Sequence, residues 1–392
     1  MSTLLVLPDF REEDWPSMDL AAEKLVEYLQ LNDSPSLNVH SHTPVFSKIA
    51  TALPFQYRQA SRFNFDRLLN RLIVYPRQVR CLSSRYDLFH VADHTYSALV
   101  HSLPAQRTGV YCHDLDAFRC LIDPRAEPRP WWFRKMAERI LSGMQKAAVV
   151  FHSTLPVRDA ILKHRLVDQE KLVHAPYGVS EEFSPNADAS PSASMPETAA
   201  KERSKYTSRL EWLPNAQGQP WIAHVGSCIP RKRIDVLLDV FARLRESIPE
   251  LQLVKIGGDF SRDHEQQIES LNLRSAIVHR KGLERSELAE VYRSANAVLI
   301  TSDAEGFGLP VIEAMACGAM VVASDIPVLR ETGGTGAVFA RVGDIDDWVG
   351  RIHEVVANSP ELPSLSTRLE WAARFSWTEH ARIIANAYAK LL

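Results

Sequence analysis

Short apolar runs alternate with longer amphipathic stretches along most of this chain. A short apolar run is typical of a buried strand, and apolar positions that recur every three or four residues are typical of a helix. The regular alternation therefore predicts β-α units with parallel sheets, an α/β fold class. In the first half, strands are predicted at 3–7, 87–91, 108–111, 147–151 and 172–175, with helices at 17–30 and 131–145. In the second half, strands are predicted at 222–225, 252–256, 277–279, 297–300, 320–323 and 337–339.

A stretch with neither period separates the two series. Residues 184–216 are rich in Pro, Ser, Ala and Asn with mixed charges, which indicates a linker or an insertion. The second β-α series begins at Trp221, and a length of 392 residues also favours two domains. We therefore expect one Rossmann-like domain at 1–183 and another at 217–374.

The composition is that of a globular enzyme and makes several other classes improbable. Hydrophobic residues make up 45% and charged residues 24% of the chain, which is ordinary globular usage. A net charge of −3 argues against general affinity for nucleic acid. The five cysteines include no Cys-x-x-Cys pair, so neither a disulfide framework nor a zinc ribbon is indicated. We expect a reducing, cytoplasmic location.

Neither a signal peptide nor a membrane span is predicted. The apolar run 4–7 is too short for a signal peptide and is followed at once by Pro8 and Asp9. A run of about 18 apolar residues, which a spanning helix requires, does not occur. Any membrane contact is therefore expected to be peripheral.

The most informative motif lies between Glu305 and Gly318. Pro310 suits the first turn of a helix, and Gly318 suits the left-handed cap that follows one, so a helix is predicted at 310–317. A loop with closely spaced glycines precedes it, and consists of Gly306, Phe307, Gly308 and Leu309. The free N–H groups and positive dipole of the helix N-terminus would suit a phosphate approaching that loop.

Two carboxylates flank this predicted anion site. Because carboxylates repel a bare phosphate, the ligand needs a neutral, hydroxyl-rich group beside its anion, and a nucleotide-sugar has both. Glu313 would then accept hydrogen bonds from the ribose, and Glu305 from the sugar. Taken singly, Glu305 also suits an exposed loop and Glu313 a solvated helix face; the glycines and Pro310 in register favour the site.

A second motif, 224–241, places cations before an amphipathic helix. A strand leads into Gly226 and Ser227, and then Arg231, Lys232 and Arg233 precede the helix. Cations at a helix N-terminus are unfavourable unless an anion joins them, which a diphosphate would do. The alternative is a solvated basic turn. A dehydrogenase is not favoured, because the dinucleotide fingerprint Gly-x-Gly-x-x-Gly follows none of the predicted strands.

The segment from Glu305 to Glu313 resembles the Glu-x7-Glu signature of retaining GT-B glycosyltransferases, in particular glycosyltransferase family 4. The resemblance implies two Rossmann-like domains facing a central cleft, with Lys232 and Arg231 on the leaving diphosphate. Many relatives have arginine after the glycine, where this chain has Ser227. Segments 281–288 and 291–297 resemble the base-pocket loop and its helix, with Leu283 near the base and Ser286 as N-cap. By resemblance, 375–392 holds a helix that crosses back to the first domain.

The first half resembles the family more weakly. His113 follows a predicted strand and resembles the cleft histidine that contacts the donor sugar or orients the acceptor, although a buried structural histidine is the alternative. His94 and Tyr177 are lesser candidates. The Gly-Gly loop of relatives is absent, and 15–19 stands in its place.

Basic and aromatic residues mix in two segments of the first half. Residues 51–85 hold seven arginines and one acid, a face suited to an anionic acceptor or lipid, although a solvated helix face is the favoured interpretation. In 130–135 the same types recur, and there the aromatic residues, including Trp131 and Trp132, are expected in the core.

These features predict a retaining, metal-independent glycosyltransferase. It would move a hexosyl group from a nucleotide-diphosphate sugar to a hydroxyl of a glycan, lipid-linked or small-molecule acceptor, with no cofactor. The catalytic residues would be Lys232, Glu305 and His113. The alternatives are a nucleotide-sugar epimerase of the same fold and a catalytically silent nucleotide-sugar-binding protein.

Overall fold

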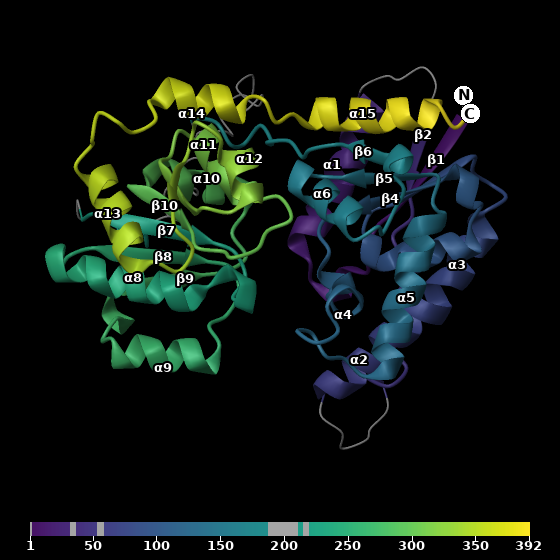
Figure 1. Cartoon of the computed structure of the whole chain (residues 1–392), viewed down its shortest axis with the longest axis horizontal. Coiled ribbons are helices and arrows are strands. Elements are labelled where there is room, and N and C mark those ends of the chain that lie inside the picture. Colours follow the sequence, from purple (N-terminus) through teal and green to yellow (C-terminus); the bar gives the residue numbers. More distant parts are fainter. Residues whose placement is uncertain (1, 32–36, 53–58, 187–210, 215–218) are drawn as a thin grey trace, which may run out of the picture. The chain divides into compact units, whose positions relative to one another are not determined.

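The chain forms two compact units (Figure 1). The computed structural model describes residues 2–31, 37–52, 59–186, 211–214 and 219–392. Unit 1 comprises Met1–Gly178 together with Trp377–Leu392, and unit 2 comprises Val179–Ser376. Most of the predicted linker, 187–210 and 215–218, lies outside the described residues.

Unit 1 contains a parallel sheet of six strands in the order β2-β1-β3-β4-β5-β6. Its strands are β1 (Ser2–Leu7), β2 (Leu37–Ser41), β3 (Leu88–Val91), β4 (Thr108–Cys112), β5 (Val149–His152) and β6 (Leu172–His174). All except β2 were predicted. Because β2 is an edge strand with alternating buried and exposed residues, it has no apolar run to reveal it.

Helices surround this sheet, and the core lies between them and its strands. They are α1 (Pro16–Leu31), α2 (Gln59–Leu69), α3 (Tyr75–Leu82), α4 (Arg119–Ile122), α5 (Trp131–Lys146), α6 (Leu155–Lys163) and α15 (Trp377–Ala389). A 3-10 helix, His94–Ser102, packs against α5. The last helix, α15, packs on α1, and its Tyr388 hydroxyl donates to the Phe89 carbonyl at 2.9 Å.

Unit 2 repeats the design with the strand order β12-β11-β10-β7-β8-β9, all parallel. Its strands are β7 (Trp221–Val225), β8 (Gln252–Ile256), β9 (Ile277–Arg280), β10 (Ala297–Ile300), β11 (Val321–Ser324) and β12 (Val338–Ala340). Its helices are α8 (Ile234–Ser247), α9 (Arg262–Ser270), α10 (Arg285–Ser294), α11 (Leu309–Ala316), α12 (Pro327–Gly333), α13 (Ile345–Val356) and α14 (Leu365–Ala372). The predicted α/β class with parallel sheets is confirmed.

Each sheet has a point where the chain reverses the direction in which it adds strands. In unit 2 the strands after β7 are added on one side as β8 and β9, and then on the other side starting with β10. In unit 1 the corresponding point lies between β1 and β3. Ligands of open α/β sheets bind at the carboxyl ends of the strands beside such a switch point.

The helix predicted at 310–317 is confirmed as α11, with each bound one residue earlier, and Gly318 adopts the predicted left-handed conformation after it. Two local predictions were wrong. The N-cap of α10 is Glu284 rather than Ser286, since Glu284 and Glu287 form a reciprocal capping box. Trp131 and Trp132 are 77% and 50% exposed, because the apolar stripe of α5 begins only at Ala137.

All five cysteines lie in the described part of the chain, and each is a free thiol. No described helix is long and apolar enough to cross a lipid bilayer.

Candidate functional site

The two sequence motifs of unit 2 meet at the carboxyl ends of β7 and β10, which pair directly. The turn after β7 contains Gly226 and leads into a 3-10 helix, Pro230–Lys232. The loop after β10 contains Glu305 and leads into α11. Since β7 and β10 flank the switch point of this sheet, the fold brings together residues more than seventy positions apart in sequence.

Glu305, from the loop after β10, contacts two cations of the other motif. Lys232 Nζ lies 2.5 Å from its Oε1, and the Arg231 guanidinium lies 3.1 Å from its Oε2. The Ser302 hydroxyl donates to Oε1 at 2.6 Å. The side chain is only 6% exposed, so the carboxylate is buried but well partnered.

These partners keep Glu305 ionised. Burial disfavours the charged form, but Lys232 and then Arg231 outweigh it and hold the pKa of Glu305 below its ordinary value. The third cation, Arg233, lies apart from Glu305 and pairs with Asp235 at 2.9 Å. The structure thus separates Arg231 and Lys232 from Arg233, and the sequence analysis likewise placed only Arg231 and Lys232 on the diphosphate.

Backbone contacts lock the two loops together. The Asp303 N–H donates to the Arg231 carbonyl at 2.9 Å, and the Thr301 hydroxyl donates to the Lys232 carbonyl at 2.9 Å. Arg231 also donates to the Ala304 carbonyl at 3.0 Å. Both cations are therefore held in place by main-chain contacts as well as by Glu305.

The turn after β7 lies close to Lys232. A Cβ placed on Gly226 would lie 3.9 Å from Lys232 Nζ, at van der Waals contact, so the turn passes directly beside the amine. Ser227, the next residue, is exposed. Beneath the turn, the fully buried Lys255 donates to the carbonyls of Gly226 at 2.7 Å and Ile256 at 3.0 Å.

Lys255 was missed by sequence reasoning. It lies within the apolar run of β8, and a lysine in a buried strand was the signal that could have found it. Burial lowers the pKa of its ammonium, which is held by backbone carbonyls. Its role is to fix the turn that carries Gly226.

The helix α11 begins directly beside Glu305. Its N-cap, Gly308, has φ +95°, a conformation that glycine adopts readily, and a Cβ there would lie 2.8 Å from a methyl carbon of Leu329. Phe307 is buried and packs edge-on against Phe375 at 5.8 Å. At this end the Leu309 N–H has no acceptor within the helix, Pro310 has no N–H, and the Val311 N–H donates to the Gly308 carbonyl at 2.9 Å. The end keeps the positive character of a helix N-terminus.

Glu313 lies one turn into α11 in a different environment. The Tyr292 hydroxyl donates to its Oε2 at 3.3 Å, and Arg285 lies 3.9 Å from its Oε1. Burial raises its pKa to about 7, although Arg285 and Tyr292 oppose the rise. Glu313 is thus paired with one cation at 3.9 Å, and this interaction is too weak to offset the effect of burial on its pKa.

The surroundings of Glu313 include residues that sequence reasoning did not assign to the site. Arg285 stacks on Phe183 at 4.9 Å and lies 3.5 Å from Glu182. The segment after Val179 thus belongs to unit 2, where the sequence placed it in the first domain. No local pattern marks these long-range contacts. Leu283, predicted near a base, is half-buried in the loop between β9 and α10.

His113 lies in unit 1, at the carboxyl end of β4. Its Nε2 pairs with the Ala92 carbonyl at 2.8 Å, and its Nδ1 pairs with the Tyr177 hydroxyl. Burial lowers its pKa to about 4, so the imidazole is neutral at physiological pH. Both ring nitrogens have partners within unit 1, and Tyr177, a lesser candidate, is one of them.

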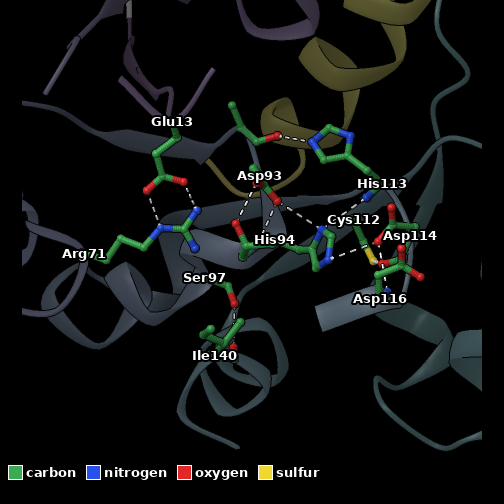
Figure 2. Close-up of polar contacts among 12 residues, drawn as sticks. Glu13, Arg71, Asp93, His94, Ser97, Cys112, His113, Asp114, Asp116 and Ile140 are labelled. Carbon is green, nitrogen blue, oxygen red and sulfur yellow. Dashed lines mark hydrogen bonds and ion pairs between the residues drawn. The ribbon is translucent and has the colours of Figure 1, made fainter. Parts of the chain in front are cut away.

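A buried polar network extends from His113 across the ends of the neighbouring strands (Figure 2). His94 Nδ1 lies 3.2 Å from Asp93, and its Nε2 lies 3.8 Å from Asp114. Burial opposes protonation of His94, but Asp93 raises its pKa above the ordinary value. Near β1, Glu13 pairs with Arg71 and accepts from Tyr96 at 2.8 Å.

This network accounts for part of the arginine-rich segment. Arg67 and Arg71 turn inward to Glu13, and Arg62 donates to the Thr51 carbonyl at 2.6 Å. Arg58 lies outside the described residues. The segment 51–85 is thus not a uniformly solvated face.

The prediction of metal independence assumed that the chain has no Asp-x-Asp sequence, and this was wrong, because two occur, at 114–116 and 344–346. In the described part of the chain, no group of three or more His, Cys, Asp or Glu side chains is placed to hold a metal ion. Asp116 pairs with Arg119 at 3.0 Å, and Asp344 caps α13. Both sequences therefore have local structural explanations.

Residues 211–374 match the family model described as glycosyl transferases group 1. This half of the chain is similar to group 1 glycosyltransferases. A D-inositol 3-phosphate glycosyltransferase of Stackebrandtia nassauensis is 33% identical over 180 residues, which cover 43% of this chain and 41% of that protein. The chain thus matches about two fifths of the length of the first curated relatives. The O-antigen chain mannosyltransferase B of Escherichia coli is 26% identical over 82% of this chain and 83% of its own.

Solved structures resemble the whole chain. Sucrose-phosphate synthase of Thermosynechococcus elongatus superposes with a TM-score of 0.74 at 19% identity, covering 100% of this chain and 99% of its own. Anabaena HepE, solved with UDP-glucose, gives 0.71 at 15% identity and covers 100% of both chains. The fold is therefore the predicted GT-B fold, and the comparisons support the resemblance to group 1 glycosyltransferases.

Proposed function

We propose that this chain is a retaining glycosyltransferase of the family 4 type. It transfers a hexosyl group from a nucleotide-diphosphate sugar to a hydroxyl of a glycan, lipid-linked or small-molecule acceptor. The observation that carries the proposal is the convergence of Lys232 and Arg231 on the buried Glu305, beside the N-terminus of α11, which has no side-chain cap.

The diphosphate would be held by positive groups. Without a donor, Glu305 pairs with both Lys232 and Arg231, and its single negative charge offsets one of their two positive charges. A bound diphosphate would take over these cations and the N–H groups at Leu309, and they would stabilise the charge that grows as the sugar leaves. Glu305, released from its cations, would accept a hydroxyl of the sugar. In this exchange Glu305 would keep the Ser302 hydroxyl as a donor and gain the sugar hydroxyl in place of its cations.

The rest of the donor would extend over neighbouring loops. Glu313 would accept hydrogen bonds from the ribose, and backbone groups at Leu283 would face the base. The main chain of Gly226, Ser227 and the loop Gly306, Phe307, Gly308 would line the diphosphate and sugar. With cations and a helix dipole on the diphosphate, we propose that the reaction needs neither a metal nor a cofactor.

His113 is proposed to orient the reacting sugar. Its Nδ1 would become available only by exchanging the Tyr177 hydroxyl for a sugar hydroxyl, because Nε2 is already engaged by Ala92. We propose retention of configuration with attack of the acceptor from the face that the nucleotide leaves, and no carboxylate is assigned as a covalent nucleophile.

The comparisons guide the choice of donor and acceptor to test. HepE was solved with UDP-glucose, and two relatives are named O-antigen chain mannosyltransferases. We therefore propose UDP-glucose and GDP-mannose as the first donors, and a glycan or lipid-linked glycan as acceptor, in the cytoplasm.

Peripheral membrane contact is proposed for unit 1. Trp131 and Trp132 are exposed at the start of α5, and Arg134 and Lys135 follow them on the same exposed turn. Exposed tryptophans beside cations suit the interface of an anionic bilayer.

The test is donor turnover by the wild-type protein and by Lys232→Ala. If Lys232 stabilises the leaving diphosphate, kcat should fall by about a hundredfold or more. Lys163→Ala, at the exposed end of α6, is the matched control and should retain full activity. An unchanged kcat with only a raised KM would remove Lys232 from the chemistry.

The products decide between the alternatives. Free nucleotide together with a product of retained anomeric configuration, seen by NMR, supports the proposal, and chelators should not alter the rate. An isomerised nucleotide-sugar formed without acceptor would indicate an epimerase. Donor binding without turnover would indicate a silent binding protein.

A further inference from the structure

A buried lysine lies beneath the turn that follows β7. Lys255, in β8, has no exposed surface, and its Nζ donates to three main-chain carbonyls: Gly226 at 2.7 Å, Ile256 at 3.0 Å and Gly258 at 3.4 Å. An ammonium group has three N–H donors, so these three acceptors match the protonated form. Burial lowers the pKa of Lys255, and Cys228 opposes this effect. The charge of Lys255 is thus held by main-chain dipoles.

These carbonyls belong to two turns that pack against each other. Gly226 begins the turn after β7, and Gly258 lies in the turn after β8. A Cβ on Gly257 would lie 2.4 Å from the Gly226 carbonyl oxygen, and a Cβ on Gly258 would lie 3.0 Å from the Ser227 Cα. The two turns are therefore in direct contact, and Lys255 bonds to both of them from the buried side.

The bond to Gly226 also sets the direction of the next main-chain donor. The Gly226 carbonyl points toward Lys255, and in a trans peptide the following N–H, that of Ser227, points the opposite way. Ser227 is exposed, and Gly226 lies beside the Lys232 amine. The Ser227 N–H is therefore directed away from the interior, at the turn where the proposed function places the diphosphate.

The charge of Lys255 is not balanced locally. In the part of the chain that the structure describes, no carboxylate forms an ion pair with it. Asp259 opposes the lowering of its pKa, but the Asp259 side chain is 72% exposed and pairs with Lys281 at 2.8 Å. A buried cation without a carboxylate is costly unless another anion joins it.

A diphosphate would supply that anion. Arg231, Lys232 and Lys255 carry three positive charges, and Glu305, which pairs with the first two, carries one negative charge. These four groups therefore have an excess of two positive charges. The diphosphate of a nucleotide-sugar carries two negative charges, so it matches this excess only if Lys255 is counted.

We propose that Lys255 is a positioning residue of the diphosphate site and acts without touching the ligand. It holds the turn so that the Ser227 N–H faces the diphosphate, and it adds a positive charge from below the turn. The proposal rests on the proposed function, which places the diphosphate there. Because the charge is buried, its attraction acts through a low effective dielectric constant and is screened little by salt.

The test compares the wild type with Lys255→Met and Lys255→Gln. Methionine has a similar length but neither charge nor donor, whereas glutamine keeps an amide donor for the Gly226 carbonyl. Binding of UDP, GDP and inorganic pyrophosphate to the full chain is measured by calorimetry. We expect both variants to bind these diphosphates about tenfold more weakly or worse, at low and at high salt. Wild-type affinity in Lys255→Gln would show that the charge is not needed and would overturn the proposal.

Nucleoside binding separates this role from a merely structural one. Uridine and guanosine lack the diphosphate, so both variants should bind the nucleoside like the wild type in saturation-transfer NMR. Equal losses of nucleoside and diphosphate affinity would show that Lys255 only maintains the fold, and would contradict the proposal. Arg243→Met, which removes an exposed cation from α8, is the matched control and should bind both kinds of ligand like the wild type.

The proposed function and the role of Lys255 fail separately. If both variants lose diphosphate affinity but the wild type turns over none of the nucleotide-sugars, the transferase activity fails and the role of Lys255 stands. If the wild type transfers sugar and both variants keep its diphosphate affinity, the role of Lys255 fails and the activity stands. If the wild type binds none of the diphosphates, both fail.

Discussion

Glu305 and Glu313 are both buried carboxylates, yet their surroundings shift their pKa values in opposite directions. Glu305 has Lys232 and Arg231 within 3.1 Å, whereas the nearest cation to Glu313 is Arg285 at 3.9 Å. A pair of carboxyl groups held in different protonation states usually has different tasks. Here the ionised one sits among the cations proposed for the diphosphate, and the other sits where the ribose is proposed.

The raised pKa of Glu313 predicts how stability depends on pH. In the folded chain its pKa is about 7, and in the unfolded chain it returns to its ordinary, lower value. Between those values the folded state binds the extra proton, so the contribution of Glu313 to stability falls as pH rises through about 4.5 to 7. The whole shift corresponds to about 3 kcal/mol. Glu313→Gln should therefore gain stability relative to the wild type on going from pH 5 to pH 8.

Denaturant unfolding, followed by tryptophan fluorescence at pH 5 and pH 8, measures the difference in stability between Glu313→Gln and the wild type. Glu246→Gln, an exposed acid on α8, is the control, and its stability relative to the wild type should not change with pH. Identical pH dependence for Glu313→Gln and Glu246→Gln would contradict the raised pKa.

At the scale of elements, the position of α11 depends on its N-cap. Gly308 combines φ +95° with close approach to the buried Leu329. Gly308→Ala should destabilise unit 2 by about 1–3 kcal/mol and weaken nucleotide binding, because the helix N-terminus must shift. Gly350→Ala, within α13 where a Cβ meets no atom within 4 Å, should be neutral or stabilising. Calorimetry and nucleotide titration of both variants give the comparison, and normal nucleotide binding by Gly308→Ala would argue against α11 as the phosphate site.

Membrane contact is predicted at the start of α5. Replacing Trp131 and Trp132 by alanine should abolish cosedimentation with vesicles of phosphatidylcholine and phosphatidylglycerol, since both exposed rings would otherwise enter the interface. Trp15, 44% exposed before α1, is a matched tryptophan, and Trp15→Ala should sediment like the wild type. Binding that persists in the double variant, or that is equal with phosphatidylcholine alone, would refute this contact.

The sequence predicted most elements because buried parallel strands are continuous apolar runs, as in β7 and β10. It missed β2, whose exposed face breaks the run, and it misplaced Trp131 and Trp132, because an amphipathic helix can extend beyond the core. Glu305 and Lys232 were proposed from local motifs. Tyr292 and Arg285 were not assigned to Glu313, because their approach depends on how α10 packs against α11.

At the scale of the whole molecule, the chain passes between the units twice, after Gly178 and after Ser376. The two passages meet in unit 2, where the Val179 N–H donates to the Phe375 carbonyl at 3.1 Å. The last helix, α15, therefore completes a unit that began with the first strand. Its Trp377, Ile384 and Tyr388 are fully buried in unit 1.

Removing α15 should therefore lower the stability of unit 1 and leave the stability of unit 2 unchanged. Deleting 377–392 removes several large buried side chains from the core of unit 1. Each of them contributes about 1.5–3 kcal/mol to the stability of the folded state by its burial. Their sum is comparable to the whole stability of an ordinary domain, so unit 1 should unfold. The ion pairs of Lys232, Arg231 and Glu305 lie within unit 2 and remain, so nucleotide should still bind within a few fold while transfer is lost.

Calorimetry of this truncation should therefore lack the transition of unit 1 and keep that of unit 2, which added nucleotide should raise in temperature. Deleting only 391–392, beyond α15, is the control and should leave both transitions in place. If the long truncation kept both transitions, α15 would not be a structural part of unit 1. If it lost both, then the folding of unit 2 would depend on unit 1, and the nucleotide site could not be studied apart from it.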